Sequence, residues 1–224
     1  MILEETQTTV SRRNENIDFL RAIGCIAVIL LHVNAWCFEI EKLSIGIRIE
    51  NVLINTIVRF AVPCFMLITG TYIFKNADEL GWKNFYKKAV EKLLFPTLYF
   101  SLLYVIYTVF KGFLQREFLV EEALIKWMHG IPFGHMWYMY MLIGFYIATP
   151  FLCQIRSKLG RKAWAFLGVF CILASAVNFN GSLIAPNWIL CWVQYVGYFI
   201  IGDFCGGGGK NQKRLLSMLG LVAA

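Results

Sequence analysis

Six runs of about 20 mostly apolar residues dominate the sequence, and short polar segments separate them. The runs cover residues 17–37, 52–74, 93–113, 135–152, 163–179 and 188–204. A helix of this length crosses a hydrocarbon core of about 30 Å. Helices and closed barrels are the structures that satisfy every backbone hydrogen bond inside a bilayer. The runs therefore predict an all-α, polytopic transmembrane helical bundle with six spans.

The composition supports a membrane protein. Hydrophobic residues make up 58% of the chain and charged residues 16%, whereas soluble domains carry about 25% charged residues. A soluble protein with this composition would expose large apolar patches to water. We interpret residues 1–16 as a cytoplasmic N-terminal segment and residues 17–224 as a membrane domain. Residues 215–224 are apolar but too short to span, and we interpret them as the start of a seventh helix in a chain that is truncated at its C-terminus.

The basic residues are distributed unevenly between alternate loops. Fourteen of the 21 lysines and arginines lie in one set of segments: before the first run, between the second and third, between the fourth and fifth, and after the sixth. Five lie in the alternate loops. Cytoplasmic loops carry the excess of positive charge. We therefore predict a cytoplasmic N-terminus and an outward loop at 114–134. The net charge of +7 resides in these loops, as expected of segments near anionic lipid, and does not indicate nucleic-acid binding.

Neither a metal site nor a disulfide framework is evident in the sequence. The seven cysteines are scattered, contain no C-x-x-C pair and lie mostly within apolar runs. A cysteine in such a run behaves as a small hydrophobic residue. We expect no bound metal and no resident cofactor.

Two ionisable residues on the first run are candidates for function, because charged groups at membrane depth are costly. Arg21 and His32 are 11 residues apart, about three helical turns and about 16 Å along one face. A structural alternative exists for each residue. Arg21 can extend its charge to the interface with Asp18 as its partner, and His32 can make a structural interhelical hydrogen bond.

Arg59 lies within the second run and is a candidate partner of His32. If the two runs form antiparallel spans, we expect both residues at similar depth. A neutral imidazole can take a proton from a hydroxyl nucleophile, while a guanidinium stabilises an oxyanion. The alternative is that Arg59 anchors the second span at the outer interface. Trp137 and Tyr140 open the fourth run on the outer side, where an aromatic belt is the common explanation.

Five segments in order resemble one known family. They are residues 18–23 (DFLRAI) followed by His32, 59–70 (RFAVPCFMLITG), 92–96 (KLLFP), 135–140 (HMWYMY) with Tyr146 and Pro150, and 197–202 (GYFIIG). Together they resemble the membrane-bound acyltransferase-3 family, beginning with its D-x-L-R-x10-H first helix. Thr69 stands where that family usually has serine.

The resemblance implies a bacterial inner-membrane enzyme of about ten helices. Such enzymes transfer an acyl group, often acetyl, from cytoplasmic acyl-CoA to a hydroxyl of a surface glycan or a lipid-linked sugar. In this chain the resemblance implies that Arg21 binds the donor's phosphates, that His32 is the general base and that Arg59 stabilises the oxyanion. Trp137 and Tyr140 would then contact the sugar or the acyl carrier.

Two other hypotheses remain open. The chain can be a transporter or exporter of a small polar solute, with His32 and Arg59 as substrate or proton-relay residues. Inverted repeats and helices broken within the membrane would favour that function. The chain can also be an inactive truncated fragment, because the family's later helices are missing from it.

Overall fold

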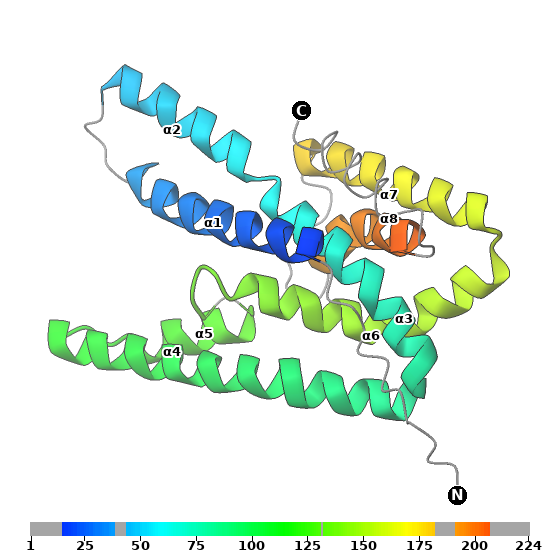
Figure 1. The fold of residues 1–224 in the computed structure, drawn as a ribbon. Coiled ribbons are helices and arrows are strands. Elements are labelled where there is room, and N and C mark those ends of the chain that lie inside the picture. The colour runs from blue at the N-terminus through cyan, green and yellow to red at the C-terminus, as the bar shows by residue number, and fades with distance from the viewer. Residues whose placement is uncertain (1–14, 39–43, 131, 182–190, 207–224) are drawn as a thin grey trace, which may run out of the picture. The chain divides into compact units, whose positions relative to one another are not determined.

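A computed structural model describes residues 15–38, 44–130, 132–181 and 191–206. Its elements are α1 (Glu15–Phe38), α2 (Ile45–Val58), α3 (Ala61–Ala89), the π-helical turn η1 (Val90–Leu94), α4 (Phe95–Gln115), α5 (Val120–Met128), α6 (Trp137–Lys158), α7 (Arg161–Gly181), the 3-10 turn η2 (Cys191–Tyr195) and α8 (Val196–Gly206). The regular elements of the described residues are all helical, with no strand among them, as Figure 1 shows. The all-α prediction is confirmed for them.

Three stretches of the described residues are long and apolar enough to cross a membrane: Ile17–Ala35, Ile45–Gln115 and Trp137–Lys158. The middle stretch is 71 residues long and contains several helices. The predicted count of six spans is therefore not confirmed. The predicted seventh helix at 215–224 and most of the N-terminal segment 1–16 lie outside the described residues.

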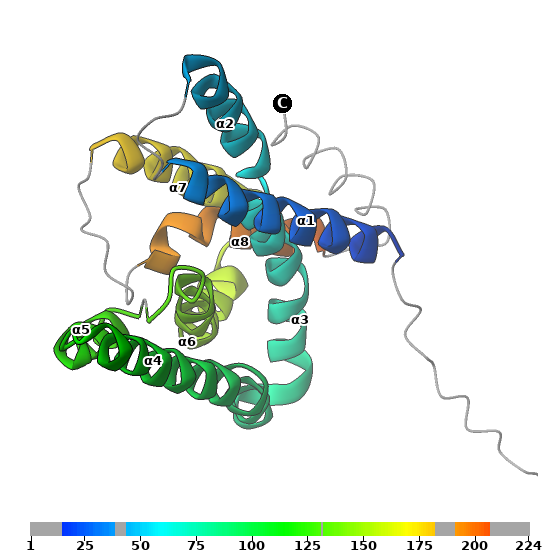
Figure 2. The same ribbon diagram turned by 90° about the vertical axis from the view of Figure 1, so that its left-hand side faces the viewer.

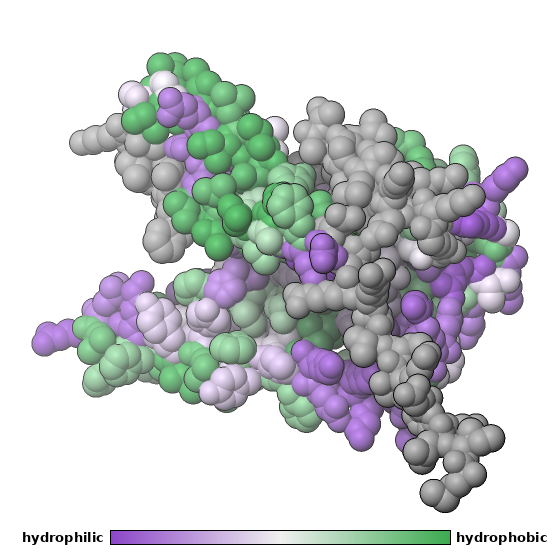
Figure 3. Space-filling view, in the orientation of Figure 1, coloured by the Kyte–Doolittle hydropathy of each residue, from purple (hydrophilic) through white to green (hydrophobic). Residues whose placement is uncertain are grey.

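The chain divides into two compact units, residues 1–61 and 62–224. In the first unit, α1 and α2 pack against each other around a small cluster of Ala27, Val58 and Ala61. Many large side chains on the two helices are exposed, such as Phe19 at 66% and Ile57 at 69%. Figure 3 shows hydrophobic residues over α2. An apolar surface of this extent is expected where side chains face lipid.

The core of the second unit lies between α3, α6, α7 and α8. Its fully buried side chains include Phe74, Phe145 and Phe199. The ring of Phe145 stacks on that of Phe199 with centroids 4.4 Å apart. Figure 1 shows α7 beside α8, and both views show α5 beside α4. The predicted loop at 114–134 thus contains a helix, α5.

Helices α3 and α8 approach each other closely because glycines line their contact. A Cβ atom on Gly70 would lie 2.1 Å from the carbonyl oxygen of Phe199, and one on Gly202 would lie 2.1 Å from that of Leu67. The Thr71 hydroxyl donates to the carbonyl oxygen of Gly202 at 3.0 Å. Small residues and hydroxyl groups at a helix contact are typical of packing in membranes.

The second predicted run, 52–74, is not one continuous helix. Helix α2 ends at Val58 and α3 begins at Ala61, with a turn at Arg59 and Phe60. Pro63 explains the break. It has no N–H to donate to the carbonyl four residues earlier, that of Arg59, and its ring would clash with that carbonyl.

Helix α3 also contains a sharp break at Gly81, where φ is 67° and ψ is 159°. Residues with a side chain rarely adopt this conformation, whereas glycine adopts it readily. The break separates an N-terminal part of α3, whose first 14 residues are mostly apolar, from the basic segment that leads through η1 to α4.

Candidate functional site

Arg21 lies near the start of α1 and is paired with Asp18. The distance from Arg21 Nη1 to Asp18 Oδ1 is 3.3 Å, and the arginine side chain is 47% exposed. This is the contact that their i, i+3 spacing predicts. A guanidinium has five N–H donors in a planar fork. Pairing with Asp18 is therefore compatible with binding of a phosphate group as well.

His32 lies 11 residues further along the same helix, about 16 Å from Arg21 along the axis. Its side chain is half-buried. Leu31 and Asn34 contribute to the face that α1 turns towards α2, and His32 lies to one side of that face, since it is one residue from Leu31, about 100° further round the helix.

One buried hydrogen bond fixes the register between α1 and α2. Asn34 Nδ2 donates to the backbone oxygen of Asn51 at 2.7 Å, and both residues are more than nine-tenths buried. Ala27 and Val58, each seven residues from this bond, belong to one packed cluster. The two helices therefore run antiparallel, with Asn34 opposite Asn51 and Ala27 opposite Val58.

This register corrects the expected depth of Arg59. Continuing it by one residue places the backbone of Arg59 opposite Ile26, whereas His32 lies six residues further along α1. The difference is about 9 Å along the axis, so the backbones of Arg59 and His32 are not level. Arg59 is also the C-cap of α2 and not part of a helix interior.

The side chain of Arg59 is held by Asn55, one turn earlier in α2. Arg59 Nε donates to Asn55 Oδ1 at 2.7 Å. Helical side chains point towards the N-terminus of their helix, which for α2 is the end joined to α1. The guanidinium is therefore displaced from its own backbone towards the level of His32. Sequence reasoning missed Asn55, although its i, i+4 spacing from Arg59 was a readable signal.

The other two predicted site residues, Trp137 and Tyr140, belong to the second unit. The Trp137 ring is half-buried and lies 6.1 Å from that of Tyr195. Tyr140 is 8% exposed, and its hydroxyl lies 2.9 Å from Ser101 Oγ on α4. Tyr140 thus contributes to the contact between α6 and α4 and has little ring surface for a ligand. Trp137 and Tyr140 lie in the second unit, whereas Arg21, His32 and Arg59 lie in the first.

A charged cluster in the second unit was also missed. Arg156 on α6 bonds to Asp203 on α8 at 2.8 Å and forms an ion pair with Asp78 on α3. The indole Nε1 of Trp164 on α7 donates to Asp203 at 2.9 Å. The guanidinium also lies 5.1 Å from the ring centroid of Phe74. The cluster links four helices through residues distant in the chain, and sequence spacing gave no signal for it.

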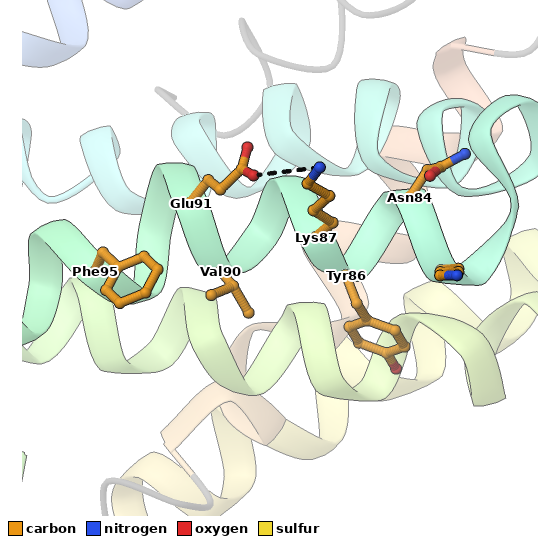
Figure 4. Close-up of a pocket in the computed structure, with 7 residues that line it drawn as sticks. Asn84, Tyr86, Lys87, Val90, Glu91 and Phe95 are labelled. Carbon is orange, nitrogen blue, oxygen red and sulfur yellow. Dashed lines mark ion pairs between the residues drawn. The ribbon is translucent and has the colours of Figure 1, made fainter.

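A surface groove runs along the basic segment after Gly81. Its lining residues are Lys83, Asn84, Tyr86, Lys87, Val90, Glu91 and Phe95. Figure 4 shows Asn84, Lys87 and Glu91 on one side of the helix and Tyr86 on the other, with Lys87 paired to Glu91 at 4.0 Å. Lysine and tyrosine are enriched where membrane proteins meet the head-group region. None of the predicted site residues lines this groove.

Comparison with known proteins identifies one family. The profile of the family described as "Acyltransferase domain", acyltransferase 3, matches residues 14–224. The chain is 20% identical over 218 residues to a Bacillus subtilis (strain 168) protein named "Putative membrane-bound acyltransferase YfiQ", and the match covers 92% of this chain and 59% of that protein. No solved structure matches the chain.

Two further relatives are named racemases. The chain is 31% identical over 170 residues to the serine/alanine racemase of Enterococcus gallinarum, a match covering 71% of this chain and 22% of the racemase. It is 27% identical over 155 residues to an amino-acid racemase of Enterococcus faecalis, covering 67% and 21%. The chain thus spans about three-fifths of YfiQ and about one-fifth of each racemase.

Proposed function

Because the chain belongs to the acyltransferase 3 family, whose profile covers residues 14–224, we propose that it is an integral membrane O-acyltransferase. It transfers an acyl group, acetyl in the simplest case, from acyl-CoA to a hydroxyl of a surface glycan or a lipid-linked sugar. The profile match carries this proposal. Acyl-CoA is a co-substrate in this reaction, and the direct transfer needs no metal.

The chemistry follows from the residues of α1 and α2. Arg21 binds the donor's phosphates through charge-assisted hydrogen bonds. His32 takes the proton of the acceptor hydroxyl, whose oxygen attacks the thioester carbonyl. Arg59 stabilises the tetrahedral oxyanion. Collapse of that intermediate forms the ester, breaks the C–S bond and releases CoA thiolate, which the His32 imidazolium protonates. Trp137 contacts the acceptor sugar or the acyl carrier.

The proposed location is a bacterial inner membrane, with a cytoplasmic N-terminus, six spans and the start of a seventh. The loop charges favour this orientation. It places Arg21 near the cytoplasmic surface, where acyl-CoA is available, and His32 in the outer half of the membrane. The distance of about 16 Å between them along α1 is then bridged by the flexible pantetheine arm of the donor.

A second candidate function is the handling of a small polar solute, such as an amino acid, by a membrane domain. Two observations favour it. Two relatives are named racemases, and each match covers only about one-fifth of the relative. The helix break at Arg59 and Phe60 is a feature that transporters use to expose polar backbone to a substrate.

Inside-out membrane vesicles distinguish the two candidates. We expect vesicles that carry the protein to transfer label from [14C]acetyl-CoA to their glycan fraction. His32→Gln keeps hydrogen bonding but cannot act as the base, so it lowers the rate by about 10²–10⁴-fold at unchanged protein level. Arg21→Lys keeps the charge but loses the planar fork, so it raises the KM for acetyl-CoA. Saturable serine or alanine movement with no acetyl transfer would favour the second candidate.

A further inference from the structure

Two asparagines of α2 and the arginine that caps its C-terminus lie on one face of the helix. Asn51, Asn55 and Arg59 are spaced four residues apart, so their side chains follow one another along the surface. Asn51 lies at the buried end of this row, where its backbone oxygen accepts the Asn34 hydrogen bond. Asn55 and Arg59 are joined by the 2.7 Å hydrogen bond from Nε to Oδ1.

The register of α1 and α2 shows where this hydrogen bond holds the guanidinium along the helix axis. The backbone of Arg59 lies opposite Ile26, about 9 Å short of the level of His32. Asn55 lies opposite Leu30, two residues or about 3 Å from that level. A guanidinium bonded to Asn55 is therefore held, along the helix axis, most of the way back to the level of His32.

We propose that Asn55 is a positioning residue that holds the Arg59 guanidinium near the level of His32, so that the base and the oxyanion-binding group address one reacting carbonyl. This inference rests on the proposed acyl transfer. An amide suits the task because its oxygen accepts from Nε without neutralising the guanidinium. The full positive charge and the two terminal nitrogens then serve the oxyanion.

The hydrogen bond between Asn55 and Arg59 can be tested without an activity assay. The chain is labelled with arginine 15N at Nε and reconstituted in lipid nanodiscs, and the Arg59 signal is identified by its loss in Arg59→Lys. We expect Asn55→Leu to speed hydrogen exchange at the Arg59 Nε–H by about tenfold or more, because a hydrogen bond to a charged group is lost. Asn55→Asp should keep the protection. The matched control is Thr56→Val, which removes an adjacent local hydrogen bond to Val52.

The catalytic consequence is tested by acetyl transfer from [14C]acetyl-CoA in inside-out vesicles. Asn55→Leu should lower kcat by about 10²-fold, the effect of misplacing a catalytic group by about 1 Å, with the KM for acetyl-CoA unchanged. In an Arg59→Ala background the same change should have almost no further effect, since Asn55 acts through Arg59. If Asn55 had only a structural role, Asn55→Leu would lower kcat by the same factor in the wild-type and Arg59→Ala backgrounds.

The outcomes separate the two proposals. Unchanged Nε–H exchange in Asn55→Leu, or a full 10²-fold effect of Asn55→Leu in the Arg59→Ala background, would overturn the positioning role. Wild-type vesicles that transfer no acetyl label would instead overturn the acyltransferase proposal. In that case the exchange measurement alone decides whether Asn55 positions Arg59.

Discussion

Replacement of Gly70 by alanine tests the contact between α3 and α8. The new Cβ would lie 2.1 Å from the carbonyl oxygen of Phe199, while ordinary contact begins at 3.4 Å. The two atoms must therefore separate by about 1.3 Å. A backbone oxygen cannot rotate away as a flexible side chain can, so α8 must move away from α3.

The expected cost follows from that movement. Overpacking of a well-packed contact costs about 1–3 kcal/mol. The hydrogen bond from Thr71 to the Gly202 oxygen, now 3.0 Å, would lengthen beyond a useful distance, at about 0.6 kcal/mol for a membrane interface. We expect Gly70→Ala to lower the free energy of unfolding by about 1.6–3.6 kcal/mol, which for a chain of this size lowers the Tm by about 3–14 °C.

Thermal unfolding in detergent micelles, followed by loss of the monodisperse species, measures this effect. Gly160→Ala is the control, because a Cβ at that position meets nothing within 4 Å. A Tm for Gly70→Ala within about 2 °C of the control would refute the argument. Gly202→Ala should cost as much as Gly70→Ala, and the double variant less than the two together, because one displacement of α8 accommodates both methyl groups.

Three further predictions concern the charged cluster, the two buried asparagines and the orientation in the membrane. Arg156→Gln leaves two carboxylates without their arginine partner and should destabilise the chain by about 2–4 kcal/mol in the same unfolding assay. The control Arg161→Gln loses only a 3.4 Å contact to a backbone oxygen and a ring contact, so it should cost less than about 1 kcal/mol. Equal losses in the two variants would contradict the importance of the cluster. Asn34→Leu removes the buried hydrogen bond and should cost about 0.5–1.5 kcal/mol. Asn51→Leu should be neutral or stabilising, because the buried Nδ2 of Asn51 has no partner among the described residues. A lower Tm for Asn51→Leu than for Asn34→Leu would exclude this reasoning. A cysteine replacing Glu121, in a background without native cysteines, should react with an impermeant maleimide from outside intact cells; labelling from the cytoplasmic side alone would reverse the proposed orientation.

Several helices were predictable because their limits are set locally. Helices α1, α4 and α6 follow the predicted runs, since the length of an apolar segment and its basic flanks are properties of neighbouring residues. The family resemblance was also readable from five short motifs and is confirmed by the profile match. The pairing of Arg21 with Asp18 followed from helical spacing alone.

Other features depend on information that apolar periodicity does not contain. The break at Arg59 was missed because apolar residues continue on both sides of it, although Pro63 marks it. The depth of Arg59 depends on the register with α1, which one hydrogen bond from Asn34 determines. The contacts of Arg156 join residues 47 and 78 positions apart, and no local pattern predicts such partners.

The glycine contact between α3 and α8 has a consequence for synthesis on the ribosome. Thr71 and Gly202 are 131 residues apart, so at about 5–20 residues per second Thr71 is synthesised roughly 7–26 s before its partner. Helices α1 and α2 face no such delay, since Asn34 and Asn51 are 17 residues apart and can pair as soon as both have emerged. During that interval the Gly70 face of α3 lacks this partner, and α8 must displace whatever covers that face in the meantime.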